Sequence, residues 1–261
     1  MVVKSIDFLV LQEGKVSRLE LAGVDLDDPS KISYYLNPEA LDEKLWTGVA
    51  KQYDVHSLSE NYLETIRRVQ KLYRKINPGY SKKEVLELIT EHPFVYATPK
   101  AYQLVKPVFP KEKNDDAEIH PIAHISWEQD LRRGIFISLE DHFNRDTIIG
   151  SSIHEHGHYL HFRLAAEKYK ACDSTLKELM AIFVQRKCDH HREYAEKTSH
   201  FRAQQLLQQL EQTKYYSSLN SKDQWNFLID FKTHTELQEK IESLSKASVP
   251  EFEVELELPH E

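Results

Sequence analysis

The pattern H-E-x-x-H occurs once in the chain, at His154, Glu155 and His158. Residues four apart in a helix lie about 40° from one another around its axis, so the two imidazoles share one face. Two imidazoles on adjacent turns can bind one Zn²⁺, at about 2.0–2.1 Å from each nitrogen. Glu155 is rotated by about 100° from His154, which places it beside such a metal rather than on it. This position suits a carboxylate that takes a proton from metal-bound water, so the pattern predicts hydrolytic zinc chemistry.

A catalytic zinc ion needs a third protein ligand in addition to water. A histidine six residues after His158 is excluded, because that position is Leu164. The other option is a glutamate on a later helix, and Glu178 follows His158 by 20 residues. Glu178 also ends a T-x-x-E capping-box pattern, in which it would cap its own helix. Because Asp173 or Ser174 could cap that helix instead, we favour Glu178 as the ligand.

Other residues near the pattern have weaker assignments. His161 lies on the face of His158, and we interpret it as a residue that orients a ligand or packs against a neighbouring helix, although it could bind metal itself. We expect His156 to be exposed or to face substrate. Gly157 costs about 1 kcal/mol in a helix interior, so its place in the apolar stripe indicates close packing of backbone beneath the site. A second metal site at 188–191 would lack a C-x-x-C partner, and we expect one zinc per chain.

Several elements must position these residues. Alternation over residues 6–11 and 16–21 predicts a β-hairpin, and a similar pattern at 252–258 predicts a strand that could pair with it. Capping-box patterns predict helices from Ser57 to about Ile76 and from Ser81 to about 92. Two further β-like runs cover 119–127 and 134–139. From residue 146 to about 247 there is no proline and little glycine, which predicts three or more helices.

The composition supports a largely helical fold. The 261 residues include only 7 glycines, about 3%, against about 7% in an average protein. We therefore expect an α+β fold that is predominantly helical: a zincin-like catalytic domain with a small mixed or antiparallel sheet. A polar loop at 110–118 divides the chain into an N-terminal hairpin and helical lobe, 1–117, and a metal-site region, 118–261. One continuous domain is the alternative.

Charge and cysteine content exclude some classes of protein. The chain has 34 basic and 42 acidic residues, a net charge of −8, which gives no general attraction to nucleic acid. No apolar run is long enough to cross a membrane, and the N-terminus does not have the layout of a signal peptide. Two cysteines are too few for a disulfide framework. We therefore expect a cytoplasmic protein that binds neither nucleic acid nor membrane.

The active helix resembles that of a known group of enzymes. The string H-E-H-G-H-Y-L-H at 154–161 is similar to the H-E-x-G-H-x-x-H helix of the thimet oligopeptidase and oligoendopeptidase F family. The string E-L-M-A that begins at Glu178 is similar to the E-x-x-A pattern around the glutamate ligand of several gluzincin metallopeptidases. The resemblance covers about fifty residues, from 134 to 183, and those oligopeptidases are much longer chains.

The resemblance implies a zinc metallopeptidase that acts on a peptide or protein substrate, with Glu155 as the general base. It also implies that the strand at 134–139 is a sheet edge that pairs with substrate, although an ordinary sheet strand would have the same sequence. A stabiliser of the oxyanion remains to be found among downstream residues. No spacing distinguishes His190, His191, Tyr194 or His234, and analogy favours Tyr215 and Tyr216.

Two other functions fit the same sequence. One is a regulatory or interaction protein on a zincin scaffold, which acts on one partner or has lost turnover. The other is a non-catalytic helical module with a structural metal. A measurement of metal content together with a broad peptide-cleavage assay separates the three.

Overall fold

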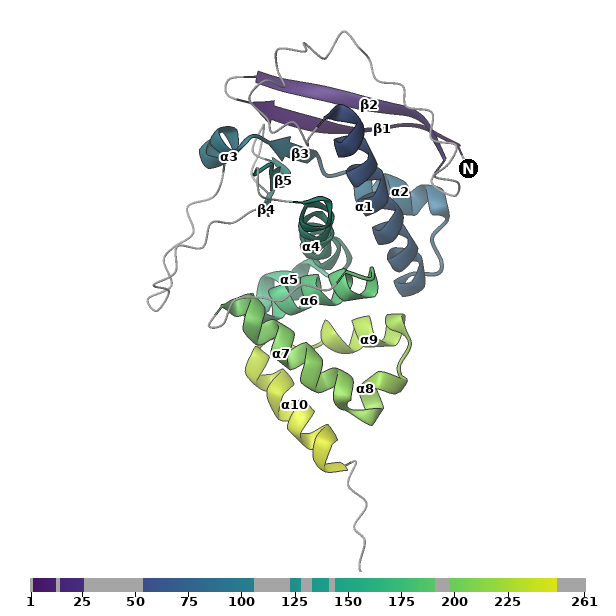
Figure 1. The fold of residues 1–261 in the computed structure, drawn as a ribbon. Coiled ribbons are helices and arrows are strands. Elements are labelled where there is room, and N and C mark those ends of the chain that lie inside the picture. Colours follow the sequence, from purple (N-terminus) through teal and green to yellow (C-terminus); the bar gives the residue numbers. More distant parts are fainter. Residues whose placement is uncertain are drawn as a thin grey trace, which may run out of the picture.

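The structure is a computed structural model that describes residues 2–12, 15–25, 54–105, 123–127, 133–140, 144–190 and 198–247. In these ranges the chain has an α+β fold in which helices predominate over one mixed sheet (Figure 1). The strands are β1 (Val2–Gln12), β2 (Lys15–Asp25), β3 (Phe94–Ala97), β4 (Ala123–Trp127) and β5 (Arg133–Ser138). The helices before the metal-site region are α1 (Val55–Ile76), α2 (Lys82–Thr90) and α3 (Pro99–Val105). Those after β5 are α4 (Arg145–Leu164), α5 (Ala166–Ala171), α6 (Ser174–Lys187), α7 (Ser199–Gln212), α8 (Lys214–Ser218), α9 (Ser221–Leu228) and α10 (His234–Ala247).

The described strands form a five-stranded sheet in the order β2-β1-β3-β5-β4. The predicted hairpin is confirmed, because β1 and β2 pair antiparallel. β1, β3 and β5 are parallel to one another, and β4 runs antiparallel to β5. One sheet therefore joins strands from both sides of the loop at 110–118, which itself lies outside the described residues, as does the strand expected at 252–258.

The expectation that residues 134–139 form an edge strand is wrong. β5 pairs with β3 on one side and with β4 on the other, so β4 is the edge of the described sheet. The reason is burial on both faces, which is typical of internal parallel strands and of their continuous apolar sequences. Ile135 and Ile137 pack into the main core, whereas Phe136 packs on the opposite face, in a small cluster with Tyr102 of α3.

Local capping explains the start of the first two helices. α2 begins as predicted, with the Ser81 hydroxyl and the Glu84 carboxylate each bonded to the backbone of the other residue. α1 begins earlier than its capping-box pattern suggests, because Asp54 is the N-cap and its carboxylate accepts the N–H of Ser57. Aspartate is as good an N-cap as serine, so the first residue that can cap sets the start.

Helix α4 lies between the sheet and α6, and it contacts α1, α5, β4 and β5 as well (Figure 1). Its residues from 148 to 161 are all buried. The predicted helical region is confirmed, since α4 to α10 account for most of residues 145–247. The H-E-x-x-H residues therefore lie on a helix that is buried over most of its length.

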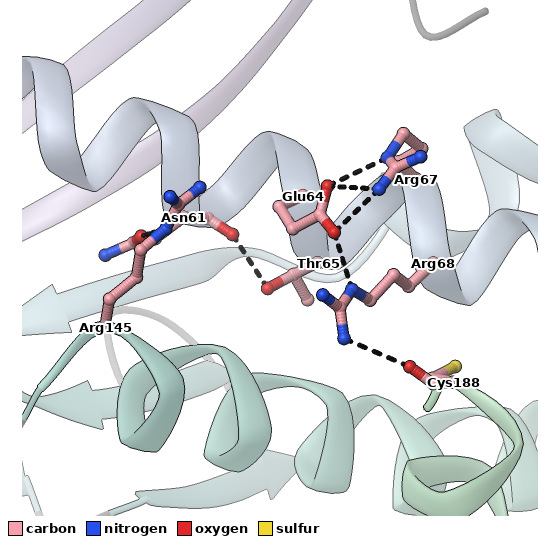
Figure 2. A network of polar contacts seen from close by, with 7 residues as sticks. All are labelled: Asn61, Glu64, Thr65, Arg67, Arg68, Arg145 and Cys188. Carbon is pink, nitrogen blue, oxygen red and sulfur yellow. Dashed lines mark hydrogen bonds and ion pairs between the residues drawn. The ribbon is translucent and has the colours of Figure 1, made fainter. Parts of the chain in front are cut away.

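Polar side chains on α1 hold it against α4 and the end of α6 (Figure 2). Asn61 accepts a hydrogen bond from Arg145 at 3.2 Å. Arg68 pairs with Glu64 at 2.6 Å and donates to the backbone carbonyl of Cys188 at 3.2 Å. α1 thus closes one side of the α4–α6 pair.

Candidate metal centre

The three residues expected to bind metal lie together. One ligand atom from each of His154, His158 and Glu178 falls within 4.8 Å of the other two. Glu178 Oε2 is 3.1 Å from Nε2 of His154 and 3.5 Å from Nε2 of His158. Ligands about 2 Å from one tetrahedral zinc are about 3.3 Å apart, so these separations fit one ion. The donor set, two imidazoles and one carboxylate, is also one that zinc enzymes use.

The start of α6 explains why Glu178 is available to α4. Asp173 is the N-cap of α6, and its Oδ1 accepts the backbone N–H of Leu176 at 2.9 Å. The capping role that the T-x-x-E pattern offered to Glu178 is therefore already filled. Its carboxylate points instead to the two imidazoles of the neighbouring helix α4.

A close contact between helices sets this register. A Cβ built on Gly157 would lie 2.6 Å from the Cα of Ala181, where real Cβ atoms are essentially never found. The predicted close packing at Gly157 is confirmed. Ala181 is one turn after Glu178, so a small residue in each helix lets the backbones meet beside the ligand atoms.

Charge complementarity holds Glu178 in its ionised form. Burial alone would raise the pKa of its carboxyl group, but His200, His158 and His154 outweigh burial and hold that pKa well below its usual range. Burial lowers the pKa of His154 to about 4, so its imidazole is neutral near pH 7. A charged carboxylate and a neutral imidazole are the forms that bind metal.

Glu155 lies next to the ligand group and to the edge strand. Its side chain is buried, which raises its pKa to about 7, while a backbone hydrogen bond from Ile125 of β4 favours its charged form. A carboxylate that titrates near neutral pH is suited to accept a proton and then release it. The placement therefore agrees with the role that the H-E-x-x-H pattern predicts.

A further histidine, His200 in the first turn of α7, lies beside Glu178. Its Nε2 is 2.9 Å from Glu178 Oε2, and its ring stacks on that of His154, with centroids 5.2 Å apart and an angle of 25° between planes. No local pattern marks this histidine. Only the packing of α7 against α6 brings it to the site.

Two histidines of α4 lie away from the ligand group. His156 is buried, with Nδ1 2.7 Å from the carbonyl oxygen of Ser152 and its ring stacked on Phe94 of β3. The expectation that His156 is exposed is wrong, because the sheet covers that face of α4. The ring of His161 packs edge-on against Tyr169 and Trp225.

The structure does not bring the predicted tyrosines to the site. Tyr215 is half-exposed and Tyr216 is fully buried, and both contact Phe227. They follow the C-terminal end of α7, whose 14 residues span about 20 Å from the end that carries His200. Between His200 and these tyrosines, α7 leads the chain away from the ligand group.

The other downstream candidates are structural or lie outside the described residues. His234 Nδ1 is 2.9 Å from Asp173 Oδ2, which ties α10 to the start of α6. The imidazole of His190 lies against Gly150, where it would overlap any added Cβ. His191 and Tyr194 fall outside the described ranges. Within those ranges, Cys188 and His190 belong to no group that could hold a metal.

Comparisons with models of protein families, with curated proteins and with solved structures found no match for this chain. The likeness to gluzincins therefore rests on the residues of α4 and α6 alone. In the part of the chain that the structure describes, no helix combines the length and the apolar character needed to cross a membrane.

Proposed function

We propose that this protein is a zinc-dependent metallopeptidase with a gluzincin-type site. The observation that carries the proposal is the convergence of His154, His158 and Glu178 on one point, with the buried Glu155 beside them. The H-E-x-x-H pattern assigns metal binding to His154 and His158 and the role of base to Glu155, and Glu178 adds the third ligand. One zinc per chain is the cofactor, because the described residues supply one ligand group.

The residues of the site have separate roles. His154, His158 and Glu178 would hold a zinc ion, which would supply a water of lowered pKa and polarise the substrate carbonyl. Glu155 is placed to accept a proton at its carboxylate and to release it to the amine that leaves.

The edge strand β4 offers a place for an extended peptide. Ile125 lies directly opposite Ile135, whose N–H donates to Pro93 on the other side of β5. This pair is therefore a non-hydrogen-bonded pair, in which both backbones point their polar groups away from each other. The C=O of Ile125 faces the outer edge of the described sheet, where a peptide strand could add, while its N–H is already bonded to the Glu155 carboxylate.

The substrate class and the compartment follow from the same features. We propose a peptide or protein substrate, because backbone pairing along β4 recognises extended chain rather than a particular side chain. The net charge of −8 gives no general attraction to nucleic acid. Cys172 and Cys188 are both free and buried, which suits a reducing compartment, and we propose the cytoplasm.

Burial of the ligand group favours a second candidate function. The side chains of His154, His158 and Glu178 are only 7%, 9% and 18% exposed, and structural zinc sites are closed to water and substrate. A structural metal, or an interaction protein on the same scaffold without general turnover, would have such a site.

The test combines zinc content with cleavage of a broad peptide library. We expect one zinc per chain and general cleavage by the parent protein. Glu155→Gln keeps the size of the side chain but removes the base, so it should keep zinc and lose turnover by about 10²–10⁴-fold. Glu167→Gln on exposed α5 is the matched control and should behave as the parent.

The results separate the candidates. Zinc without cleavage of any peptide in the library would favour the structural or interaction function. Cleavage by Glu155→Gln at the rate of the parent would contradict the proposed mechanism, whatever the zinc content.

A further inference from the structure

Three imidazoles surround one oxygen of Glu178, and they come from two different helices. Oε2 is 3.1 Å from His154 and 3.5 Å from His158, both on α4, and 2.9 Å from His200 on α7. His200, the nearest of the three, is the one that the H-E-x-x-H chemistry does not use. Its side chain is 35% exposed, so it lies at the rim of the group.

The contacts of His200 differ from those of a ligand. The ligand atoms that lie within 4.8 Å of one another belong to His154, His158 and Glu178, and this group does not extend to His200. The His200 ring lies nearly parallel to the His154 ring, at 25°. The rings of His154 and His158, by contrast, meet at 80°.

We propose that His200 is a positioning residue, which donates its Nε2 hydrogen to Glu178 and so directs that carboxylate at the metal. This inference rests on the proposed function, because it needs Glu178 to be a ligand. Once His154 and His158 give their nitrogen lone pairs to a metal, they no longer donate to Glu178. The N–H of His200 then keeps the carboxylate oriented, as the hydrogen-bond partners of metal ligands commonly do.

The docking of α7 does not depend on His200. Four residues of α7 are buried, namely Ala203, Leu206, Leu207 and Leu210. Near the other end of the helix, Arg186 of α6 pairs with Glu211 at 2.5 Å. A substitution at His200 should therefore leave α7 in place, and its effects can be assigned to the site.

The test measures zinc affinity by competition with a chromophoric chelator. We expect His200→Ala to weaken zinc binding roughly 10–100-fold, the usual loss when such a partner is removed. His200→Gln can still donate from its side-chain amide and should recover most of the affinity. His234→Ala is the matched control, since His234 is similarly exposed and also pairs with a carboxylate, that of Asp173. It should bind zinc as the parent does.

Zinc X-ray absorption on the loaded protein supplies a second readout. We expect two coordinated imidazoles in the parent and two in His200→Ala. Three in the parent and two in the variant would make His200 a ligand and overturn the positioning role. A parent that binds zinc no more tightly than His200→Ala would overturn this inference alone, whereas a parent that binds no zinc would overturn the proposed function as well.

Discussion

Gly157 and Ala181 meet backbone to backbone, with space for no side chain between them. A Cβ on Gly157 would lie 2.6 Å from the Cα of Ala181 and 3.1 Å from its carbonyl oxygen. This contact fixes how closely α4 approaches α6. Since His158 follows Gly157 directly and Glu178 is one turn before Ala181, it also fixes the separation of the ligand atoms.

Gly157→Ala should therefore destabilise the protein although alanine is the better helix former. The gain of about 1 kcal/mol in helix propensity is opposed by overlap with backbone atoms, which cannot rotate away. We expect overpacking to dominate and the free energy of unfolding to fall by about 1–3 kcal/mol. Urea denaturation of the metal-free protein measures this, and zinc affinity should fall in parallel.

Gly79→Ala is the matched control, because a Cβ at Gly79 would meet no atom within 4 Å. We expect its free energy of unfolding to stay within about 0.5 kcal/mol of the parent. Equal stability of the two variants would show that α4 and α6 can move apart at no cost, against the tight contact described above.

Substitution of Glu178 should distinguish a metal ligand from a residue that only packs nearby, such as His161. Glu178→Ala removes the only carboxylate of the group, so we expect loss of most of the bound zinc. His161→Ala should do less, because the ring of His161 packs against Tyr169 and Trp225 rather than among the ligand atoms. Its main effect should be a cavity and lower stability.

Zinc stoichiometry after dialysis, measured for both variants and the parent, checks this order. If His161→Ala emptied the site while Glu178→Ala left it full, Glu178 would not be the third ligand.

The parts of the site that could be predicted depend on local patterns. His154 and His158 are four residues apart in one helix, so their shared face follows from helix geometry alone. Glu178 could be predicted because a third ligand was needed and this glutamate lies on the next long helix, 20 residues after His158. The hairpin and the capping box at Ser81 are likewise encoded within a few residues.

The parts that could not be predicted depend on packing between distant segments. His200 reaches Glu178 only because α7 docks on α6, and no spacing in the sequence specifies that. His156 is polar, yet the sheet buries it against Phe94. The place of β5 within the sheet depends on its pairing with β3, about forty residues earlier in the chain.

Asp173 caps α6 and also holds the start of α10, and its removal should show both effects. Its Oδ1 caps α6 through Leu176, while its Oδ2 accepts the backbone N–H of His234 at 2.7 Å as well as its ring. Loss of an N-cap costs about 1 kcal/mol, and Asp173→Ala should cost more because α10 also loses its contact. Asp54→Ala, which removes the N-cap of α1, is the comparison.

Thermal or urea unfolding of the two variants tests this difference. Equal losses of stability would mean that the contact of Asp173 with His234 contributes nothing beyond the cap.

Buried His124 should make the metal-free protein sensitive to acid. It lies on β4, with Nδ1 2.9 Å from the hydroxyl of Tyr102 and its ring stacked on Phe136. Burial lowers its pKa from 6.5 to about 4. Between these values the unfolded chain binds a proton that the folded protein excludes, so stability that is present above pH 6.5 is lost as the pH falls.

A shift of this size removes about 2 kcal/mol of unfolding free energy between pH 7 and pH 5. His124→Asn can keep a hydrogen bond to Tyr102 but does not titrate. Between pH 7 and pH 5 its unfolding free energy should therefore fall less than that of the parent, by about 2 kcal/mol. Urea denaturation with a chelator present measures the difference without any contribution from metal release. His56→Asn, on the exposed start of α1, should follow the parent. The contrary outcome is that His124→Asn loses as much stability as the parent between pH 7 and pH 5. The folded protein would then bind a proton at His124 as readily as the unfolded chain does.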